Sequence, residues 1–281
     1  MSQRIVVLGA AGQLGHAIVQ AFSGDAEVVA LTRPDLDITD DASVETRLAA
    51  ERPTVIINCA SDNDVDGAES HPLRALEVNA FAVRTLARVA GDLGATLIHY
   101  SSDFVFDGTT SKPYVEEDQP NPQGVYAASK LLGEWFAGES PRGFVLRVES
   151  LFGAVAAGRS SLDSIVARMT QGAEVPVFTD RTVSPSYVHD IAWATRELVR
   201  RGAPAGLYHC VNTGATSWFE IATEAARLLR CEARLKPITL NDVTLRAARP
   251  MFCALSNTRL TALGIIMPTW QDALARHLQP A

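Results

Sequence analysis

The alternation of short apolar runs with helical patterns constrains the fold of this chain more than any other feature of its sequence. Five runs rich in β-branched residues lie in the first half, at positions 4–9, 27–31, 54–60, 96–102 and 144–148. A helical pattern follows each of the first four runs, and none of the runs alternates strictly between apolar and polar residues. This arrangement is typical of strands buried on both faces of a parallel sheet. The sequence therefore predicts an α/β fold with a Rossmann-type, doubly wound parallel sheet.

In the second half of the sequence, strand and helix patterns alternate less regularly. Helical patterns occur near 161–172, 190–201 and 217–230, with short strands expected near 175–178 and 206–211. The letters SWFE at 217–220 have the form of a capping box, which fixes the start of the last of these helices. We expect a dinucleotide-binding domain at 1–150, to which about 187–212 return, and a smaller substrate-binding lobe made of 151–186 and 213–281.

The composition excludes several classes of protein. The 281 residues are 47% hydrophobic and 20% charged, as in a globular chain. A formal net charge of −7 without a basic run argues against nucleic acid or an anionic membrane as the partner. Glycines break the N-terminal apolar run, and no apolar segment of about 18 residues follows. Four scattered cysteines, and no histidine at metal-like spacing, predict reduced thiols, no metal site and a cytoplasmic protein.

A glycine-rich loop follows the first predicted strand. The letters VVLGAAGQLG place Gly9, Gly12 and Gly15 three residues apart between that strand and the first helix. Glycine permits a tight turn with positive φ, lets the backbone approach a pyrophosphate, and allows the helix to pack closely on the strand. The helix N-terminus adds free N–H groups for the phosphates. The spacing differs from the G-x-G-x-x-G of long-chain dehydrogenases, so it indicates another family of dinucleotide-binding proteins.

The end of the second predicted strand bears on the choice of cofactor. An NAD-selecting protein places Asp or Glu there to bind the ribose 2′-hydroxyl, whereas this chain has Thr32 and Arg33. A guanidinium group suits a 2′-phosphate, although Asp35 is near enough to compete for the ribose. NADPH is therefore the expected cofactor, with NADH as the alternative.

Tyr126 and Lys130 lie four residues apart in a helical pattern, so their side chains share one face. A tyrosine hydroxyl has an ordinary pKa of about 10, and a neighbouring ammonium group lowers it. The pair therefore suits proton transfer at a carbonyl group, although a bare Y-x-x-x-K is common in unrelated helices. The letters HYSSDFVFDG place Ser101 and Ser102 at the carboxyl end of the fourth strand, where ligands bind in such folds.

Together these features resemble the extended short-chain dehydrogenase/reductase superfamily, and within it the dTDP-4-dehydrorhamnose reductase group. The resemblance covers nearly the whole chain and rests on GAAGQLG, LDITD (36–40), VDGAE (65–69), VNA (78–80), SSDFVFDG, YAASKLLGE, 147–153, SPSYVHDIA (184–192), TSWFEIA (216–222) and ARP (248–250). It implies an NAD(P)-dependent oxidoreductase that reduces the keto group of a nucleotide-linked 4-keto-6-deoxy sugar, as in dTDP-rhamnose biosynthesis. The implied partner is a small molecule, a nucleoside-diphosphate sugar, and a homodimer is left open.

The resemblance also implies roles for individual residues. Ser102 would polarise the substrate carbonyl, Tyr126 would donate the proton, and Lys130 would bind the nicotinamide ribose and tune Tyr126. The implied cofactor-binding residues are Gly9, Gly12, Gln13, Leu14, Gly15, Arg33, Asp37, Ile38, Cys59, Ala60, Asn79, Tyr126 and Lys130. The implied substrate-binding residues are Asp103, Val105 and Arg249. Asn79, on a long helix expected at about 73–92, would either take part in a proton relay or pack the helix against the sheet.

The chain departs from this family at clustered positions. The family's usual residues are replaced at Asp62, Asn63, Gly67, Ser150, Phe252 and Cys253. The family assigns these positions to the substrate side or its surroundings, whereas the cofactor and catalytic positions are kept. We therefore expect dTDP-4-dehydrorhamnose to be a poor substrate.

Two other functions are open at this point. The first is a nucleotide-sugar epimerase or dehydratase that recycles bound NAD. Sugar dehydratases of the superfamily need an Asp-Glu pair after the active-site hydroxyl, whereas here Asp103 is followed by Phe104. The second is a non-catalytic NADP-binding regulatory subunit, like the reductase-like subunit of methionine adenosyltransferase. The presence of Ser102, Tyr126 and Lys130 weighs against it.

Overall fold

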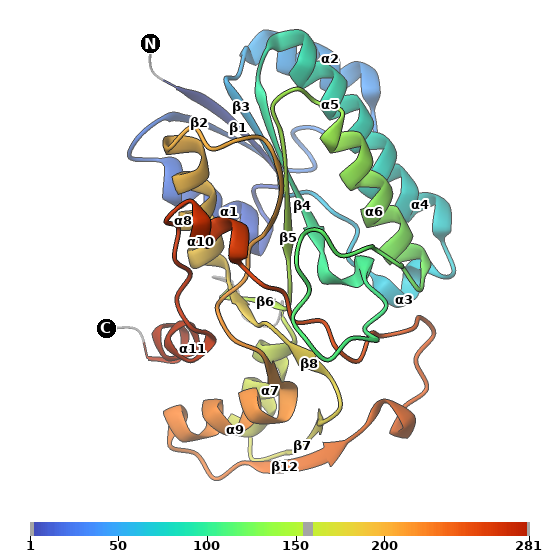
Figure 1. Ribbon diagram of the computed structural model, residues 1–281, viewed down its shortest axis with the longest axis vertical. Helices are drawn as coiled ribbons and strands as arrows, with labels where there is room; N and C mark the ends of the chain where they lie inside the picture. The colour runs from blue at the N-terminus through green and yellow to red at the C-terminus, as the bar shows by residue number, and fades with distance from the viewer. Residues whose placement is uncertain (1–2, 154–159, 280–281) are drawn as a thin grey trace.

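A six-stranded parallel sheet forms the centre of the molecule (Figure 1). The computed structural model describes residues 3–153 and 160–279. The strands of the sheet are β1 (Arg4–Leu8), β2 (Glu27–Leu31), β3 (Val55–Asn58), β4 (Thr96–Ser102), β5 (Gly143–Val148) and β10 (Gly206–His209). Their order is β10-β5-β4-β3-β1-β2, and every neighbouring pair is parallel. The predicted α/β fold with a doubly wound parallel sheet is confirmed.

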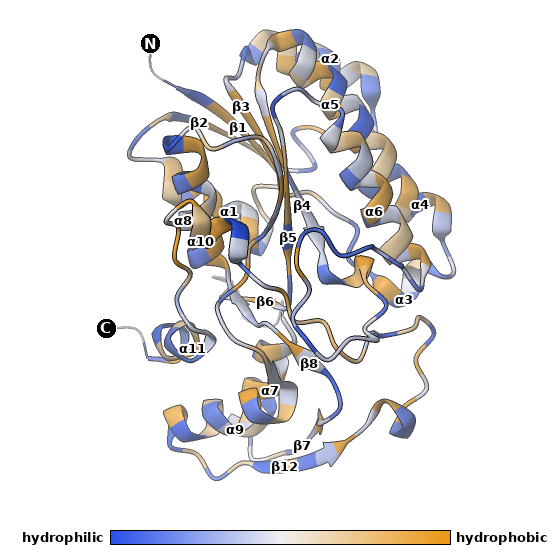
Figure 2. Cartoon of the chain, in the orientation of Figure 1, coloured by the Kyte–Doolittle hydropathy of each residue, from blue (hydrophilic) through white to orange (hydrophobic). Residues whose placement is uncertain are grey.

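Helices cover both faces of this sheet (Figure 1). On one face lie α1 (Gln13–Phe22) and α8 (Val188–Arg200), and on the other lie α2 (Asp41–Glu51), α5 (Ala82–Leu93) and α6 (Val125–Gly138). Successive side chains of a strand point to opposite faces, so Ile5 packs toward α1 while Val6 packs toward α5. Both faces of the strands are therefore apolar, as the hydropathy colouring of Figure 2 shows, and strict alternation is missing from the sequence.

The long helix expected at 73–92 is not a regular α-helix. It consists of α4 (Pro72–Leu76), a π-helical turn η1 (Glu77–Phe81) and α5, and it is preceded by the short α3 (Val65–Ala68). A π-helical turn holds more residues than an α-helical turn and changes the direction of the side chains that follow. Asn79 lies in this turn and is buried against α6.

A separate apolar core forms around Leu162, Val175, Ile221 and Trp270. We call the part of the molecule around this core the second lobe. Its main elements are α7 (Ser161–Thr170), β7 (Glu174–Phe178), α9 (Trp218–Leu229), β12 (Arg234–Ile238) and α11 (Trp270–Leu278). The predicted capping box is confirmed, because the Ser217 hydroxyl accepts from the Glu220 N–H and the Glu220 carboxylate accepts from the Ser217 N–H.

The remaining elements are short. They are β6 (Leu151–Phe152), β8 (Thr182–Val183), β9 (Ser186–Tyr187), β11 (Thr216–Ser217), η2 (Asp103–Val105), η3 (Leu240–Asp242) and α10 (Thr258–Ala262). Although α8 and β10 come late in the chain, α8 packs on α1 and β10 forms an edge of the large sheet. The division into two domains stays a prediction of the sequence.

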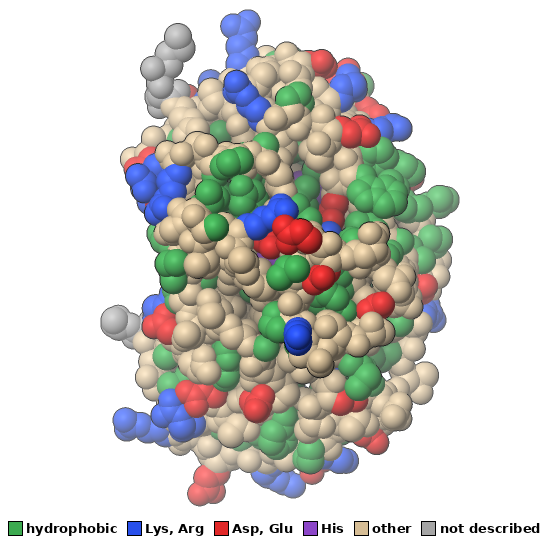
Figure 3. All heavy atoms as spheres, in the orientation of Figure 1, with side chains coloured by type: hydrophobic (Ala, Val, Ile, Leu, Met, Phe, Trp, Pro, Cys, Tyr) green, Lys and Arg blue, Asp and Glu red, His purple; other side chains and the backbone are tan. Residues whose placement is uncertain are grey.

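The visible surface carries mixed charges. Figure 3 shows acidic and basic side chains interspersed among apolar and neutral ones, without a large patch of one sign on this face. Among the described residues, no helix combines the length and the apolar character that crossing a membrane requires.

A buried ion pair joins helix α6 to the sheet. Arg147 of β5 donates from Nη2 to Glu134 Oε2 at 2.7 Å and from Nε to Glu134 Oε1 at 2.8 Å. The two side chains are only 2% and 6% exposed. Ser101 of β4 donates a third hydrogen bond to Glu134 Oε1. These contacts fix α6, which carries Tyr126 and Lys130, over the ends of β4 and β5.

Arg147→Ala should destabilise the protein strongly. The variant leaves the Glu134 carboxylate buried without its hydrogen-bonded guanidinium partner, which costs about 3–5 kcal/mol in free energy of unfolding. Urea denaturation followed by circular dichroism measures the loss. Arg47→Ala is the matched control, because the pair of Arg47 with Glu51 lies at the surface and should move the midpoint little. Equal midpoints for both variants would contradict this assignment.

Candidate active site

Two adjoining cavities lie at the carboxyl ends of the sheet strands. The first, of about 460 Å³, is bounded by the sheet edge and by Trp218 and Arg249 of the second lobe. The second, of about 600 Å³, lies beside the loops that follow β1, β2 and β3. Both are lined by Gly12, Cys59, Ala60, Ser61 and Asn63. They therefore form one continuous site at the edge where ligands bind in such folds.

The glycine loop has the geometry of a phosphate cradle. Gly9 has a φ of +72°, and a Cβ atom added there would lie 2.7 Å from the backbone nitrogen of Ala60. A Cβ atom at Gly15 would lie 2.3 Å from the carbonyl oxygen of Gly9, so this glycine permits the close packing of α1. Gly12 precedes the first turn of α1, whose N–H groups have no side-chain cap. The backbone here can approach an anionic ligand closely.

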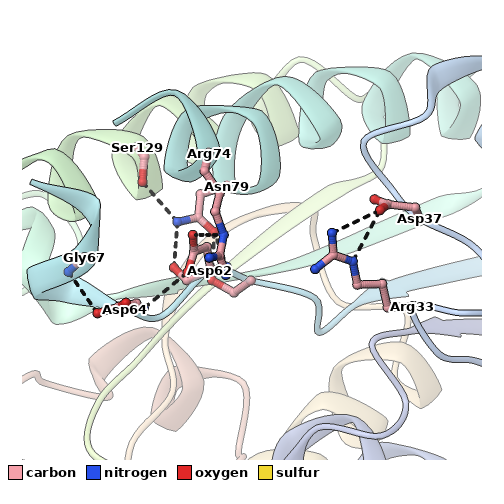
Figure 4. Close-up of polar contacts among 9 residues, drawn as sticks. Arg33, Asp37, Asp62, Asp64, Gly67, Arg74, Asn79 and Ser129 are labelled. Atoms are coloured by element: carbon pink, nitrogen blue, oxygen red, sulfur yellow. Dashed lines mark hydrogen bonds and ion pairs between the residues drawn. The ribbon is translucent and has the colours of Figure 1, made fainter. Parts of the chain in front are cut away.

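The loop after β2 forms the far end of the second cavity. Arg33 lies there with its side chain 76% exposed, and its guanidinium group donates two hydrogen bonds of 3.3 Å to Asp37 (Figure 4). Asp35 is engaged by Thr32, which donates from its N–H and its hydroxyl to one carboxylate oxygen. Arg33 is thus close to the surface of the cavity, whereas Asp35 is held in a local turn.

Tyr126 and Lys130 both line the first cavity and are almost fully buried. Lys130 Nζ donates to the carbonyl oxygen of Tyr100 at 2.7 Å and to the Ser61 hydroxyl at 3.3 Å. The Tyr126 hydroxyl donates to Asn63 Oδ1 at 3.5 Å. The ring of Phe104 meets the Tyr126 ring edge-on, with 5.7 Å between the centroids.

Burial controls the acidity of both groups. It raises the pKa of Tyr126 above the ordinary tyrosine value, and a hydrogen bond with Ser102 only partly offsets the increase. It lowers the pKa of Lys130 to about 8, against the opposing effect of Glu134. The expected lowering of the Tyr126 pKa is therefore wrong, because burial outweighs it and the described contacts of the ammonium group go to Tyr100 and Ser61. The phenol keeps its proton at neutral pH.

Ser102 and Asp103 follow one another at the end of β4. The Ser102 hydroxyl donates to Asp103 Oδ1 at 2.8 Å and accepts from the N–H of Phe104 at 3.2 Å. Both residues are buried and line the first cavity together with Tyr126. The expected neighbourhood of Ser102, Tyr126 and Lys130 at one cavity is observed.

Three predicted residues lie away from the cavity surface. Gly15 packs α1 against the glycine loop. Asn79 accepts from the Ser61 hydroxyl and the Asp62 N–H and donates to Asp62 O and Ser129 Oγ, so its amide is fully used (Figure 4). This favours the packing alternative for Asn79. Val105 is fully buried in an apolar cluster and lines neither cavity, so its expected substrate contact is wrong.

A cluster that sequence reasoning missed lies beside Ser102. The carboxylate oxygens of Asp103 and Glu149 and the sulfur of Cys253 lie within 4.8 Å of one another, and all three side chains are buried. This is the spacing of a metal site, which the sequence did not indicate. Arg181, which also lines the first cavity, acts electrostatically on both carboxylates and disfavours a cation there. The sequence did contain one signal of this cluster, because a charged residue, Glu149, directly follows the buried strand β5.

Arg249 lines the first cavity from the C-terminal side. It donates from Nη2 to Asp66 Oδ2 at 2.7 Å and from Nη1 to Ala247 O at 3.0 Å, and its side chain is 13% exposed. Arg181, which was not predicted, also lies over the Phe104 ring. The guanidinium carbons of Arg181 and Arg249 are each 5.9 Å from the centre of that ring. Two positive charges therefore border the part of the cavity that faces the second lobe.

The fold and these side chains define a short-chain dehydrogenase/reductase of the extended kind. Comparison with known proteins agrees: the model of the RmlD substrate-binding domain matches residues 3–281. The chain belongs to this family.

Relatives of this chain include named sugar reductases. A dTDP-4-dehydrorhamnose reductase of Mycobacterium tuberculosis H37Rv is 37% identical, over 99% of this chain and 93% of the relative. A dTDP-4-keto-6-deoxy-D-glucose reductase of Streptomyces niveus is 34% identical, over 98% and 96% of the two chains. The crystal structure of a dTDP-4-dehydrorhamnose reductase of Bacillus anthracis in complex with NADP superposes with a TM-score of 0.95 at 30% identity, with full coverage of both chains.

Arg33→Ala should weaken the binding of NADPH and spare that of NADH. The guanidinium group of Arg33 is exposed at the cavity and is free to exchange its long contacts with Asp37 for charge-assisted bonds to a 2′-phosphate. Fluorescence titration of both cofactors measures the change, and Arg52→Ala, a residue on the same domain away from either cavity, is the control. Equal affinity of the unmutated protein for both cofactors, unchanged in the variant, would reject this role.

Proposed function

We propose that this protein is an NADPH-dependent reductase that acts on the keto group of a nucleotide-linked 4-keto-6-deoxy sugar. The observation that carries the proposal is the meeting of Ser102, Tyr126 and Lys130 at a cavity that continues into the glycine loop. The loop fits the cofactor, because Gly9 and Gly12 line the second cavity and the N–H groups of the first turn of α1, which have no side-chain cap, follow directly. When bound there, NADPH supplies a hydride to the carbonyl carbon.

Each of the three side chains has a task in this proposal. Tyr126 keeps its proton at neutral pH and donates it to the carbonyl oxygen, so that the ketone becomes an alcohol. The positive charge of Lys130 then offsets the negative charge that develops on the phenol oxygen. Ser102 donates a hydrogen bond to the same carbonyl oxygen and orients it. Lys130 also remains available to a ribose hydroxyl of the cofactor.

Phe104 supports reduction rather than dehydration. The position after Asp103, where sugar dehydratases of the superfamily need a carboxylate, holds an aromatic ring packed against Tyr126. A carboxylate at this point would be needed to remove a second proton from the sugar. Net consumption of NADPH is therefore the expected outcome of turnover.

Tyr126→Phe should abolish reduction and leave NADPH binding nearly intact. The change removes the proton donor but keeps the packing of the ring, and loss of a positioned acid costs about 10²–10⁴ in rate. The assay follows NADPH oxidation with dTDP-, UDP- and GDP-linked 4-keto sugars, dTDP-4-dehydrorhamnose among them. A variant that retained more than about a tenth of kcat would show that another group is the acid.

Arg249 is the residue that would bind the diphosphate group of the substrate. A guanidinium fork suits paired phosphate oxygens, and Arg249 lies at the second-lobe side of the cavity, where Asp66 is its anionic partner among the described residues. Arg181 across the Phe104 ring adds a second positive charge for the same diphosphate. The altered residues Ser150 and Cys253 lie at or beside the cavity, which supports a sugar different from dTDP-4-dehydrorhamnose.

Arg249→Ala should weaken the binding of dTDP or UDP to the NADP-loaded protein by roughly 1–3 kcal/mol, the range for a hydrogen bond to a charged group. Isothermal titration calorimetry measures the affinities. Arg259→Ala serves as the control, because Arg259 pairs with Glu117 at the surface away from both cavities. Failure of every nucleoside diphosphate to bind would refute the diphosphate handle, and efficient turnover of dTDP-4-dehydrorhamnose would refute the altered sugar pocket.

A further inference from the structure

The register of two strands brings a pair of acids together next to the proposed catalytic hydroxyl. β4 and β5 are parallel neighbours, and Ser102 stands opposite Val148 at their carboxyl ends. The residues that follow, Asp103 and Glu149, therefore emerge side by side. Their exposed fractions are 4% and 2%, so neither carboxyl group is solvated.

The charges around the pair favour a single retained proton. Arg181 is the positive charge that acts on both carboxyl groups, and Cys253, the third member of the cluster, is a neutral buried thiol. When two carboxyl groups this close are both buried and face one guanidinium group, ionisation of both is strongly disfavoured. Burial raises the pKa of Asp103 to about 6 and raises the pKa of Glu149 well above its ordinary value.

The hydrogen bonds place that proton on Glu149. Its Oε2 atom accepts from the N–H of Ser184, whereas Oε1 is buried with no donor among the described residues. A carboxylate oxygen buried without a donor is costly, but a protonated carboxyl group needs only an acceptor at that atom. Asp103 offers such an acceptor, because one of its carboxylate oxygens lies within 4.8 Å of a Glu149 oxygen.

The pair acts on the proposed catalytic centre through Ser102. A hydroxyl group has one proton to donate, and that of Ser102 goes to Asp103 Oδ1. The Cys253 thiol also acts on Asp103 as a hydrogen-bond donor, but a thiol is a weak donor. While Asp103 carries a full negative charge, it therefore competes with a substrate oxygen for the Ser102 proton. We propose that Glu149 is a positioning residue, which keeps a proton on the Asp103–Glu149 pair and thereby releases the Ser102 hydroxyl to the substrate carbonyl. This inference rests on the proposed reductase function and adds a pH dependence to it.

Two substitutions separate a role of the proton from a role in packing. In Glu149→Gln the amide donates permanently to Asp103 and reproduces the protonated state with the same net charge. In Glu149→Met the volume is kept but the donor is lost. We expect kcat of the Gln variant to lie within about threefold of the unmutated enzyme at pH 7, and kcat of the Met variant to fall on the order of tenfold or more, since a lost hydrogen-bond donor to a reacting oxygen costs about 10²–10³.

The pH profile is the readout that packing alone would not move. The unmutated enzyme keeps the proton at low pH and loses it as pH rises through the raised pKa of Glu149. The ratio of its kcat to that of the Gln variant should therefore be near one at acidic pH and fall as pH rises. Lys130, whose pKa is lowered to about 8, affects both enzymes equally and cancels in the ratio. The Met variant should regain activity toward low pH, as Asp103 becomes protonated.

Glu116→Gln is the matched control. Glu116 is equally buried, accepts one backbone N–H and has an unpartnered second oxygen among the described contacts, but it lies away from the first cavity. Its variant should leave the profile of kcat unchanged. A constant ratio at all pH values, or equal losses in the Gln and Met variants, would overturn the proposal.

A second measurement does not need turnover. Carbon NMR of the NADP-loaded protein, labelled at its carboxyl groups, should show a glutamate that ionises well above its usual range, absent in Glu149→Gln and retained in Glu116→Gln. The second variant removes the upward pKa shift that burial also gives Glu116. Titration of Glu149 in the ordinary range would refute the retained proton, and a loss of activity on chelation would assign the cluster to a metal ion instead. If the unmutated protein reduces no sugar of the panel, the proposed function fails and this role of Glu149 fails with it, whereas a flat kcat ratio in an active enzyme rejects only the role of Glu149.

Discussion

The parallel register of β3, β4 and β5 is the constraint on which the rest of the site depends. Because these strands end at one edge, the residues just beyond them, including Cys59, Asp103 and Glu149, gather within one cavity. Helix α6 could meet this edge at many angles, but the buried contact of Glu134 with Arg147 ties it down. Sheet pairing and one ion pair thus determine where Tyr126 and Ser102 meet.

Burial has opposite consequences for the charged groups of this site. It makes the phenol of Tyr126 a weaker acid, and it makes the ammonium group of Lys130 a stronger one. Neutral forms are favoured throughout, which is the ordinary effect of removing water from ionisable groups. Arg181 and Arg249 line the cavity at the second-lobe side. We therefore expect anionic ligands at that side and proton transfer at the sheet edge.

The sequence predicted those features of the fold that depend on residues close together along the chain. Apolar runs predicted the first five strands of the sheet, and the letters SWFE predicted the cap of α9, because both depend on neighbours along the chain. The π-helical turn around Asn79 was missed, since its letters look like those of any amphipathic helix. The two-residue strands were missed as well, because so short a segment carries no periodicity.

The candidate site divides in the same way. The glycine loop and the pair Tyr126 and Lys130 have local spacings, so they could be predicted as candidate cofactor and proton-transfer residues before the fold was known. Arg181 and Cys253 come together with Asp103 only through long-range packing, and a charged residue in a sequence is usually solvated. The contact of Arg249 with Asp66 spans most of the chain and has no signal in either stretch. Contacts between loops that are far apart in the sequence are therefore the hardest to predict from a single sequence.

The position of β10 at the edge of the large sheet has a consequence for how the protein comes into being on the ribosome. Its partner β5 is synthesised long before β10. The segment around Cys253, whose N–H donates to the carbonyl oxygen of Thr182 in β8, leaves the ribosome later still. Before β10 is made, the growing chain therefore holds a sheet that still lacks this edge strand and a cavity that lacks one wall. Because parallel pairing between distant segments is slow to form, the nascent protein depends on the residues from β10 onward to complete the sheet and to close the cavity.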